Sequence, residues 1–147
     1  MKGYVQIYTG NTSYQTYTSL GNIVRAAGAK LKVFIFDFMQ DESDYDFRSL
    51  SKLDNVTIRR CKIDNENLLW HQDGEKKKAF LELCEILRQG EYDMVIINCH
   101  LHIIPEKEVV CLIDLKQENT ELIITGIQIS DTIIDKADLI TEQKEIK

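Results

Sequence analysis

The sequence lacks long hydrophobic segments and an excess of positive charge. No stretch reaches the ~18 consecutive apolar residues that suggest a membrane span, and Met1 to Tyr8 are too polar and too short for the core of a signal peptide. With 18 Lys and Arg against 24 Asp and Glu, the net charge is −6, whereas surfaces that bind nucleic acid are basic. We therefore expect a cytoplasmic protein that binds neither membranes nor nucleic acid.

Cysteine pairs at redox or zinc-binding spacing are also missing. Cys61, Cys84, Cys99 and Cys111 are far apart and irregularly spaced, and no C-x-x-C occurs. In a cytosolic chain such cysteines are usually reduced and buried. We expect no structural disulfide.

The sequence does contain a regular alternation of strand and helix patterns over its 147 residues, the length of one domain. Apolar or β-branched runs predict strands at 4–9, 31–36, 56–63, 94–97, 122–126 and 138–141. Apolar residues spaced by three and four predict helices at 19–29, 76–89, 106–116 and 131–136. The polar segment 40–54 is a loop or a short helix. We predict a single α/β domain over 1–147, with a mostly parallel sheet flanked by helices.

In such sheets, ligands bind beyond the carboxyl ends of the strands. The first of these turns reads TGNTSYQT from Thr9 to Thr16. A phosphate-binding P-loop uses glycines that let the backbone close around the anion, a lysine for the phosphates and a Ser or Thr for Mg²⁺. This segment has no lysine, so the motif alone does not identify a P-loop.

Four segments in order resemble one family, the ATP:corrinoid adenosyltransferases. They are "IYTGN" with "SLGNIVRAAGAKLKVFIFDF", then "NLLWHQD", "GEYDMVIINCHLHIIPEKEVVCLIDL" and "LIITGIQISDTIIDKADLITEQKEIK". The resemblance implies a P-loop NTPase fold of RecA-like type. It also implies a homodimer that uses Mg²⁺ and transfers the 5′-deoxyadenosyl group of ATP to the cobalt of a corrinoid. The nucleotide-binding positions that it implies are Thr9, Gly10, Asn11, Gln15 and Thr16, and the residue that it places near the corrinoid is Trp70.

The departures from this family lie where its chemistry takes place. Gln15 stands where the family has the loop lysine, and Tyr14 stands where it has a loop glycine. Asn98 and Cys99 replace the family's Asp-Glu pair, and Asp37 replaces a glutamine. Since one cationic partner of a phosphate is worth about 1.5–3 kcal/mol, these changes together should weaken ATP binding by several orders of magnitude. We expect no tightly bound cofactor and no metal site, and the resemblance leaves the catalytic residues unidentified.

The segment Cys99-His100-Leu101-His102 admits two interpretations. On a strand, His100 and His102 would face the same way and could share a metal, with Asp37 as a third ligand. The simpler interpretation, which we favour, is a turn with a buried cysteine and two solvated histidines. Trp70 has two interpretations of equal weight, a residue lining a flat apolar pocket or an aromatic residue of the core or dimer interface.

Three functions follow from the sequence. The one we favour is a non-catalytic relative that binds a corrinoid, another small ligand or a partner protein in cobalamin metabolism. The second is an active adenosyltransferase that binds ATP in an altered way. The third is an interaction subunit that pairs with an intact paralogue.

Overall fold

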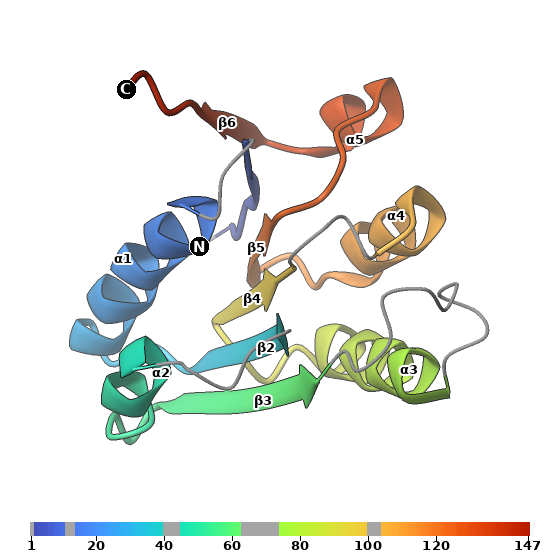
Figure 1. The fold of residues 1–147 in the computed structure, drawn as a ribbon. Helices are drawn as coiled ribbons and strands as arrows, with labels where there is room; N and C mark the ends of the chain where they lie inside the picture. Colours follow the sequence, from blue (N-terminus) through green and yellow to red (C-terminus); the bar gives the residue numbers. More distant parts are fainter. Residues whose placement is uncertain (1, 11–13, 40–44, 63–73, 100–103) are drawn as a thin grey trace.

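The computed structural model describes residues 2–10, 14–39, 45–62, 74–99 and 104–147. Strands and helices alternate along these residues (Figure 1). The elements are β1 (Val5–Gly10), α1 (Tyr14–Gly28), β2 (Val33–Met39), α2 (Tyr45–Leu50), β3 (Val56–Lys62), α3 (Gly74–Gln89), β4 (Met94–Asn98), α4 (Glu106–Leu115), β5 (Glu121–Thr125), α5 (Asp131–Lys136) and β6 (Leu139–Gln143).

The six strands form one sheet in the order β3-β2-β4-β5-β1-β6. Every pairing between neighbours is parallel, which confirms the predicted α/β fold. All five residues of the central strand β4 are buried, because helices cover both faces of a parallel sheet. Parallel pairing also brings the carboxyl ends of all six strands to the same edge, where ligands of such sheets bind.

The helices divide between the two faces of the sheet (Figure 1). One hydrophobic cluster joins α1 and α2 to the sheet and includes Ile23, Leu50 and Ile96. The other, larger cluster joins α3, α4 and α5 to the opposite face through residues such as Leu83 and Leu112. The sheet is therefore the middle layer of three.

Two of the predicted boundaries differ from the structure by three residues or more, and the structure settles one alternative. Helix α1 begins at Tyr14, five positions before the predicted start at Ser19. The sequence did not indicate this first turn, because its residues are polar, aromatic or β-branched and carry no apolar repeat. Strand β2 runs three residues beyond the predicted end, to Met39. Within the doubtful segment 40–54, α2 is a short helix at Tyr45–Leu50.

A lysine closes the amino-terminal edge of the sheet. The Nζ atom of Lys116 donates hydrogen bonds to the carbonyl oxygens of Gly3 (2.9 Å), Gln117 (3.0 Å) and Thr120 (2.9 Å), which uses all three donors of an ammonium group. A Cβ atom on Gly3 would lie 2.2 Å from the carbonyl carbon and oxygen of Thr120. The chain start and the loop after α4 are thus fixed against each other by close backbone contact.

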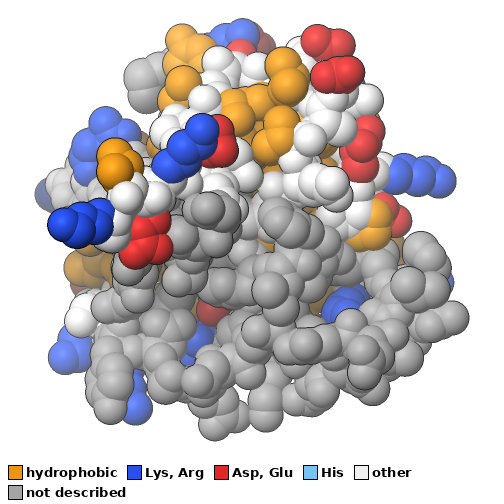
Figure 2. Space-filling view, turned by 45° about the horizontal axis from the view of Figure 1, so that its top comes forward, with side chains coloured by type: hydrophobic (Ala, Val, Ile, Leu, Met, Phe, Trp, Pro, Cys, Tyr) orange, Lys and Arg blue, Asp and Glu red, His pale blue; other side chains and the backbone are white. Residues whose placement is uncertain are grey.

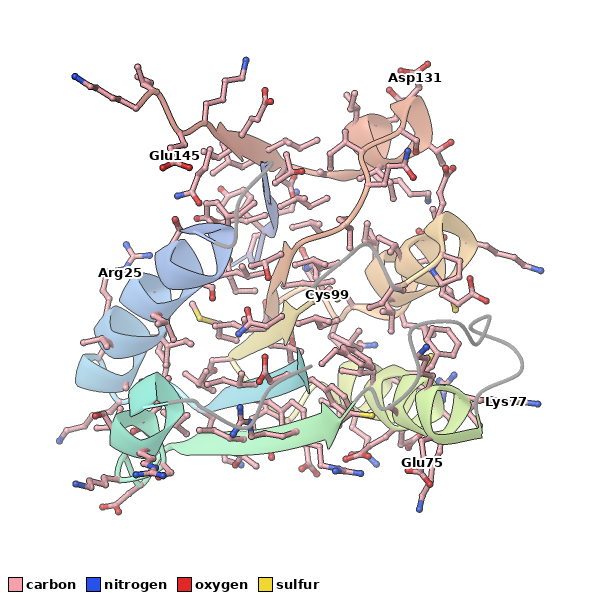
Figure 3. The ribbon with its side chains drawn as sticks, viewed as in Figure 1. Arg25, Glu75, Lys77, Cys99, Asp131 and Glu145 are labelled. Carbon is pink, nitrogen blue, oxygen red and sulfur yellow. The ribbon has the colours of Figure 1, made fainter. Side chains whose placement is uncertain are left out.

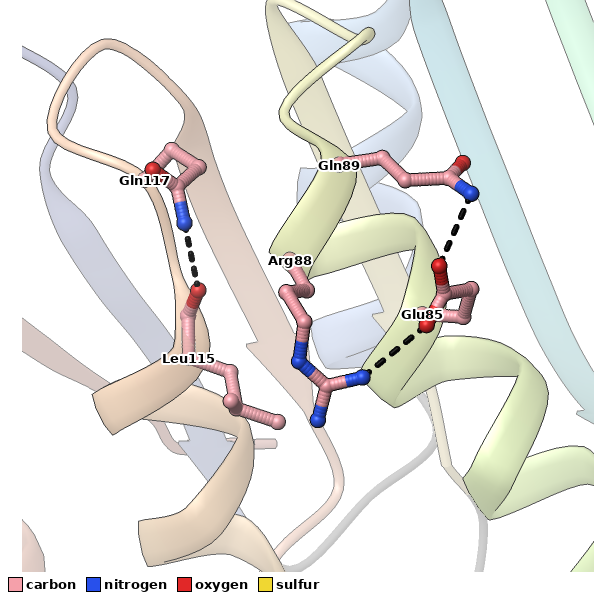
Figure 4. A network of polar contacts seen from close by, with 5 residues as sticks. All are labelled: Glu85, Arg88, Gln89, Leu115 and Gln117. Carbon is pink, nitrogen blue, oxygen red and sulfur yellow. Dashed lines mark hydrogen bonds and ion pairs between the residues drawn. The ribbon is translucent and has the colours of Figure 1, made fainter.

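The turn after α3 depends on a glycine. Gly90 has a φ of 65°, a conformation that favours glycine at the end of a helix, and a Cβ there would lie 2.8 Å from Cγ of Gln117. Near it, Arg88 and Gln89 both donate to the carboxylate of Glu85, and Gln117 donates to the carbonyl oxygen of Leu115 (Figure 4). These exposed contacts contribute little to stability.

Two further predictions from composition can be compared with the structure. All four cysteines are free thiols, and three of them are buried, as predicted. Within the described ranges, no helix is long and apolar enough to cross a membrane.

Candidate functional site

One residue from each of four adjacent strands forms a row at the carboxyl-terminal edge of the sheet. Strand register places Asp37 of β2 beside Asn98 of β4, and Asn98 beside Thr125 of β5. On the outer side of Asp37, the register partner is Arg60 of β3. Since opposed residues on neighbouring strands have adjacent side chains, this row brings a carboxylate, a guanidinium, an amide and a hydroxyl together.

Asn98 lies at the centre of this row and is fully buried. Its Oδ1 atom accepts hydrogen bonds from the hydroxyl groups of Ser19 (3.0 Å) and Thr125 (3.3 Å). Its Nδ2 atom is buried and has no acceptor among the described residues. If the amide were flipped, its nitrogen could donate to the same hydroxyls, but its oxygen would then take the unsatisfied position. Leaving such a group unpaired costs about 1–3 kcal/mol.

Asp37 is a carboxylate inside the protein, with about 1% of its surface exposed. Its Oδ2 atom lies 3.4 Å from Nε of Arg60, whose side chain is 29% exposed. The guanidinium therefore connects a buried negative charge to the surface. A buried charge needs such a partner, since isolated burial of a carboxylate is very costly.

Cys99 follows Asn98 and is also fully buried, at the middle of the molecule (Figure 3). Its backbone N–H donates to the carbonyl oxygen of Thr125 at 3.2 Å. Burial raises the pKa of the Cys99 thiol well above 9.0, and the negative charge of Asp37 raises it further. At neutral pH the side chain is therefore a thiol, whereas metal ligation and nucleophilic attack require the thiolate.

His100 and His102, which the alternative metal interpretation requires, lie outside the described residues. In the part of the chain that the structure describes, no group of three His, Cys, Asp or Glu side chains could hold a metal ion. The burial of Cys99 is confirmed, and the interpretation of the two histidines stays a prediction.

Two of the predicted nucleotide-binding positions are the last residues of β1. The hydroxyl of Thr9 donates to the carbonyl oxygen of Ile127, after β5, at 3.4 Å, and Gly10 ends the strand. Gln15 and Thr16 lie in the first turn of α1. The segment from Thr9 to Tyr17 contains no Lys or Arg. The other predicted positions, Asn11 and Trp70, fall outside the described residues.

Sequence reasoning missed three contributors to this edge: Ser19, Arg60 and the hydroxyl of Thr125. Ser19 is fully buried on the sheet-facing side of α1, and its position four residues before the buried Ile23 was a usable signal, because such residues share a helix face. Arg60 follows Arg59 in a strand, so the two must point to opposite faces. No pattern in the sequence indicates which of them meets Asp37.

The structure also has a cavity of about 220 Å³, which none of the residues of the row lines. It lies between the segments that lead into α4 and α5, and its lining residues are Ile104, Pro105, Glu106, Gln128, Ile129 and Ser130. Ligand sites usually enclose about 300–1,000 Å³, so this cavity by itself is too small for a macrocycle. The carboxylate of Glu106 also opposes an anionic ligand there.

Comparison with known proteins gives one family. The family model described as ATP:corrinoid adenosyltransferase BtuR/CobO/CobP matches residues 1–147, the whole length of the sequence. Among curated proteins, none matches the chain. The six-stranded parallel sheet flanked by helices is the α/β architecture expected for a P-loop NTPase-like protein of this kind.

Proposed function

Because this chain belongs to the ATP:corrinoid adenosyltransferase family, we propose that it is a non-catalytic member, which keeps the fold but has lost ordinary MgATP-dependent transfer. It binds a corrinoid, another small ligand or a partner protein in cobalamin metabolism. The family uses ATP and Mg²⁺, and a Mg²⁺ site needs carboxylate or phosphate oxygens with several retained waters. Asn98, at the centre of the row, does not suit this ion.

The observation that carries the proposal is the buried amide of Asn98. It stands at the end of the central strand, where the resemblance places a carboxylate, and its one oxygen is already engaged by the hydroxyls of Ser19 and Thr125. An amide carries no negative charge and attracts Mg²⁺ far less than a carboxylate does. The row therefore offers the ion neither a charged ligand nor an available oxygen at this position.

The charges around Asn98 are equally unsuited to a polyphosphate. Asp37 is the carboxylate of the row, and Arg60 forms an ion pair with it. The segment from Thr9 to Tyr17 supplies no cation. A phosphate group entering this edge would thus find the guanidinium of Arg60 already paired with Asp37 and no lysine between Thr9 and Tyr17.

An active adenosyltransferase remains the second candidate, and one observation favours it. Helix α1 has 15 residues and begins at Tyr14, just after the strand β1. Its N-terminal backbone N–H groups and its dipole attract anions whatever the side chains are. A nucleotide held by the backbone alone would make the chain a weak ATP-binding enzyme.

The decisive experiment is calorimetric titration of the protein with MgATP and, separately, with cobalamin. We expect no MgATP binding at millimolar concentration. Cobalamin binding would support the small-ligand form of the proposal, and failure of both ligands would support the partner-binding form. A thermal shift of several degrees with MgATP that a chelator abolishes, together with adenosylation of a chemically reduced corrinoid, would establish the second candidate instead.

A variant with the family residues restored, here called the revertant, tests whether the nucleotide site has only lost its binding residues (erosion) or has been rebuilt. Thr12→Gly, Ser13→Lys, Tyr14→Gly and Gln15→Lys restore the loop, and Asn98→Asp restores the carboxylate. We expect weak nucleotide affinity to return while adenosyl transfer stays poor, because Asp37, Cys99 and Ile127 remain altered. The matched control carries the four loop changes without Asn98→Asp and should bind ATP without a Mg²⁺ requirement. A folded revertant that binds no ATP would reject erosion.

A further inference from the structure

Two of the four cysteines lie where two neighbouring helices meet. Cys84 is on α3 and Cys111 is on α4, the two helices pack against each other, and both cysteines contact the larger hydrophobic cluster. Each helix follows a strand of the same parallel sheet, so the two run in the same direction. Figure 4 shows Leu115 of α4 pointing toward Arg88 of α3. Because residues four positions apart share a helix face, one turn earlier the same two faces carry Cys111 and Cys84.

The two thiols are in contact but differ in their access to water. Burial raises the pKa of Cys84 to about 11, and the charge of Cys111 and a hydrogen bond between the two thiols add to this effect. Cys84 is 6% exposed, whereas Cys111 is half-buried. Cys111 is therefore the sulfur that a small solute can reach, and Cys84 is the thiol that keeps its proton at neutral pH.

We propose that Cys84 and Cys111 form a redox-modification site, at which a peroxide converts the two thiols reversibly into a disulfide that joins α3 to α4. The thiolate of Cys111 attacks one oxygen of hydrogen peroxide, and the O–O bond breaks to give a sulfenic acid and a hydroxide, which takes up the proton that Cys111 released. The sulfur of Cys84 then attacks the sulfur of Cys111, so that an S–S bond replaces the S–O bond, and the oxygen leaves as water with the proton of Cys84.

This reaction is balanced without any group bound to the protein. Two thiols and one hydrogen peroxide give one disulfide and two water molecules, so the two sulfur atoms lose the two electrons that the peroxide gains. A dithiol in solution reverses the change by thiol–disulfide exchange and is itself oxidised to a disulfide. The site needs no ligand of the chain and is independent of the proposed function.

The charge of the surface favours a small neutral oxidant. The chain has a net charge of −6, and Figure 2 shows acidic side chains gathered over α5 and toward α4, at the upper right of the view. Asp131 and Asp135 of α5 are exposed, as is Asp114, three residues after Cys111. Such a surface lowers the local concentration of anionic oxidants, such as acidic low-molecular-weight disulfides. It does not repel hydrogen peroxide, which is uncharged and small enough to reach a half-buried sulfur.

The disulfide would constrain the part of the fold that contains the candidate site. It closes a loop of about 28 residues, and this loop includes β4 with Asn98 at its end. A covalent link across such a loop stabilises the folded chain, chiefly because it restricts the unfolded one. It also fixes α4 against α3, and α4 begins directly after Pro105, one of the residues that line the cavity.

Oxidation followed by peptide mapping tests the pairing. The full chain is treated with a small excess of hydrogen peroxide, the remaining thiols are alkylated, and the protein is digested with trypsin. Since trypsin cleaves after lysine and arginine, Cys84 lies on peptide 79–88 and Cys111 on peptide 108–116. We expect these two peptides to be joined, and to separate when dithiothreitol is added before digestion. Four remaining thiols, over-oxidation of Cys111 without a link, or a link to another cysteine overturns the proposal.

Thermal unfolding tests the effect on the fold. The oxidised wild type should unfold roughly 5–10 °C above the reduced protein, and dithiothreitol should remove the difference. Cys111→Ser changes a half-buried side chain, so the variant should fold and show no rise on oxidation. Cys61→Ala is the matched control, because it removes a buried thiol of β3 and leaves the pair intact, so the rise should remain. A rise of the same size in Cys111→Ser, or its loss in Cys61→Ala, overturns the proposal.

Discussion

Polar groups are fully hydrogen-bonded at the amino-terminal edge of the sheet, but not at its carboxyl-terminal edge. At the amino-terminal edge, Lys116 donates to three carbonyl oxygens, and the backbone of Gly3 packs directly on Thr120. At the carboxyl-terminal edge, the Nδ2 atom of Asn98 has no acceptor among the described residues, and the thiol of Cys99 is buried close enough to Asp37 for that charge to raise its pKa. At the first edge the ammonium group of Lys116 is fully hydrogen-bonded, whereas at the second an unpaired amide group lowers the stability of the fold.

This contrast separates stability from function. Polar groups that make all their hydrogen bonds need no explanation beyond the stability of the fold. A buried charge beside an amide with an unpaired N–H group, in contrast, lowers stability. Such departures from good packing are expected at functional sites. The edge with Asn98 is therefore the candidate functional edge. Acid or Mg²⁺ should recover the stability lost by a substitution there, whereas neither should recover the stability lost by a substitution at the amino-terminal edge.

The largest effect is expected at the amino-terminal edge, from Gly3→Ala. The added Cβ would lie 2.2 Å from backbone atoms of Thr120, and backbone cannot rotate away as a side chain can. We expect the free energy of unfolding to fall by at least about 3 kcal/mol, measured by urea denaturation. Gly21→Ala is the control, because nothing lies within 4 Å of its Cβ and alanine favours a helix by about 1 kcal/mol. Equal effects at both glycines would refute the tight contact.

At the opposite edge, Asn98→Asp should cost about 2–3 kcal/mol near neutral pH. It places a second buried carboxylate next to Asp37, and both desolvation and like charge disfavour its ionised form. The loss should shrink as the pH falls and the introduced carboxyl group becomes protonated, and it should shrink on addition of Mg²⁺ if the edge still accepts a metal. Asn119→Asp at an exposed position should have almost no effect. A loss that neither proton nor metal reduces would mean that the edge is a packed structural element.

A smaller effect is expected from Lys116→Met, which keeps the aliphatic stem and removes the three hydrogen bonds. The carbonyl groups are partly accessible to water, so we expect a loss of about 1.5–2 kcal/mol, at the low end for charged hydrogen bonds. Unlike the loss from Asn98→Asp, this loss should not respond to Mg²⁺ or to mild acid. Lys107→Met on the exposed side of α4 provides the control, and a change as large there would show that general charge, rather than the three carbonyl contacts, is responsible.

The strands and helices could be predicted from sequence because they depend on local periodicity. The uninterrupted apolar run of β4 and the repeat of α3 each led to an element within two residues of its observed bounds. The start of α1 could not be predicted in this way, since Tyr14 to Thr18 acquire their helical conformation without an apolar repeat. The residues of the site also divide into those that the sequence reveals and those that it does not. Asn98 and Asp37 were identified as departures from a family pattern. The contact of Arg60 with Asp37 depends on strand register, and that of Ser19 with Asn98 depends on how α1 packs on the sheet, and local patterns specify neither.

The smallest effect that we predict is a difference in alkaline pH dependence between the two edges. Burial raises the pKa of Cys99 well above 9.0, so the folded state holds its proton more tightly than the unfolded state does. The stability from this thiol is complete below pH 9 and decreases as the pH rises above 9.0. Burial lowers the pKa of Lys116 below 10.5, an effect that Asp138 and Glu121 oppose. Here the unfolded state holds the proton more tightly, so stability increases as the pH rises toward 10.5.

The opposite effects of Cys99 and Lys116 on stability can be separated with variants measured at about pH 10. Relative to pH 8, Cys99 should account for a loss of up to about 1.4 kcal/mol, since one pH unit is worth that much to one proton. Cys84, whose pKa burial and the neighbouring Cys111 raise to about 11, should add a loss of the same sign. Urea denaturation of Cys99→Ala and Cys84→Ala at both pH values should therefore each show a weaker alkaline loss than the wild type, whereas Lys116→Met should show a stronger one. If Cys99→Ala instead follows the wild-type pH profile, the thiol is accessible to water, and the dry interior on which the contrast between the two edges rests does not extend to Cys99.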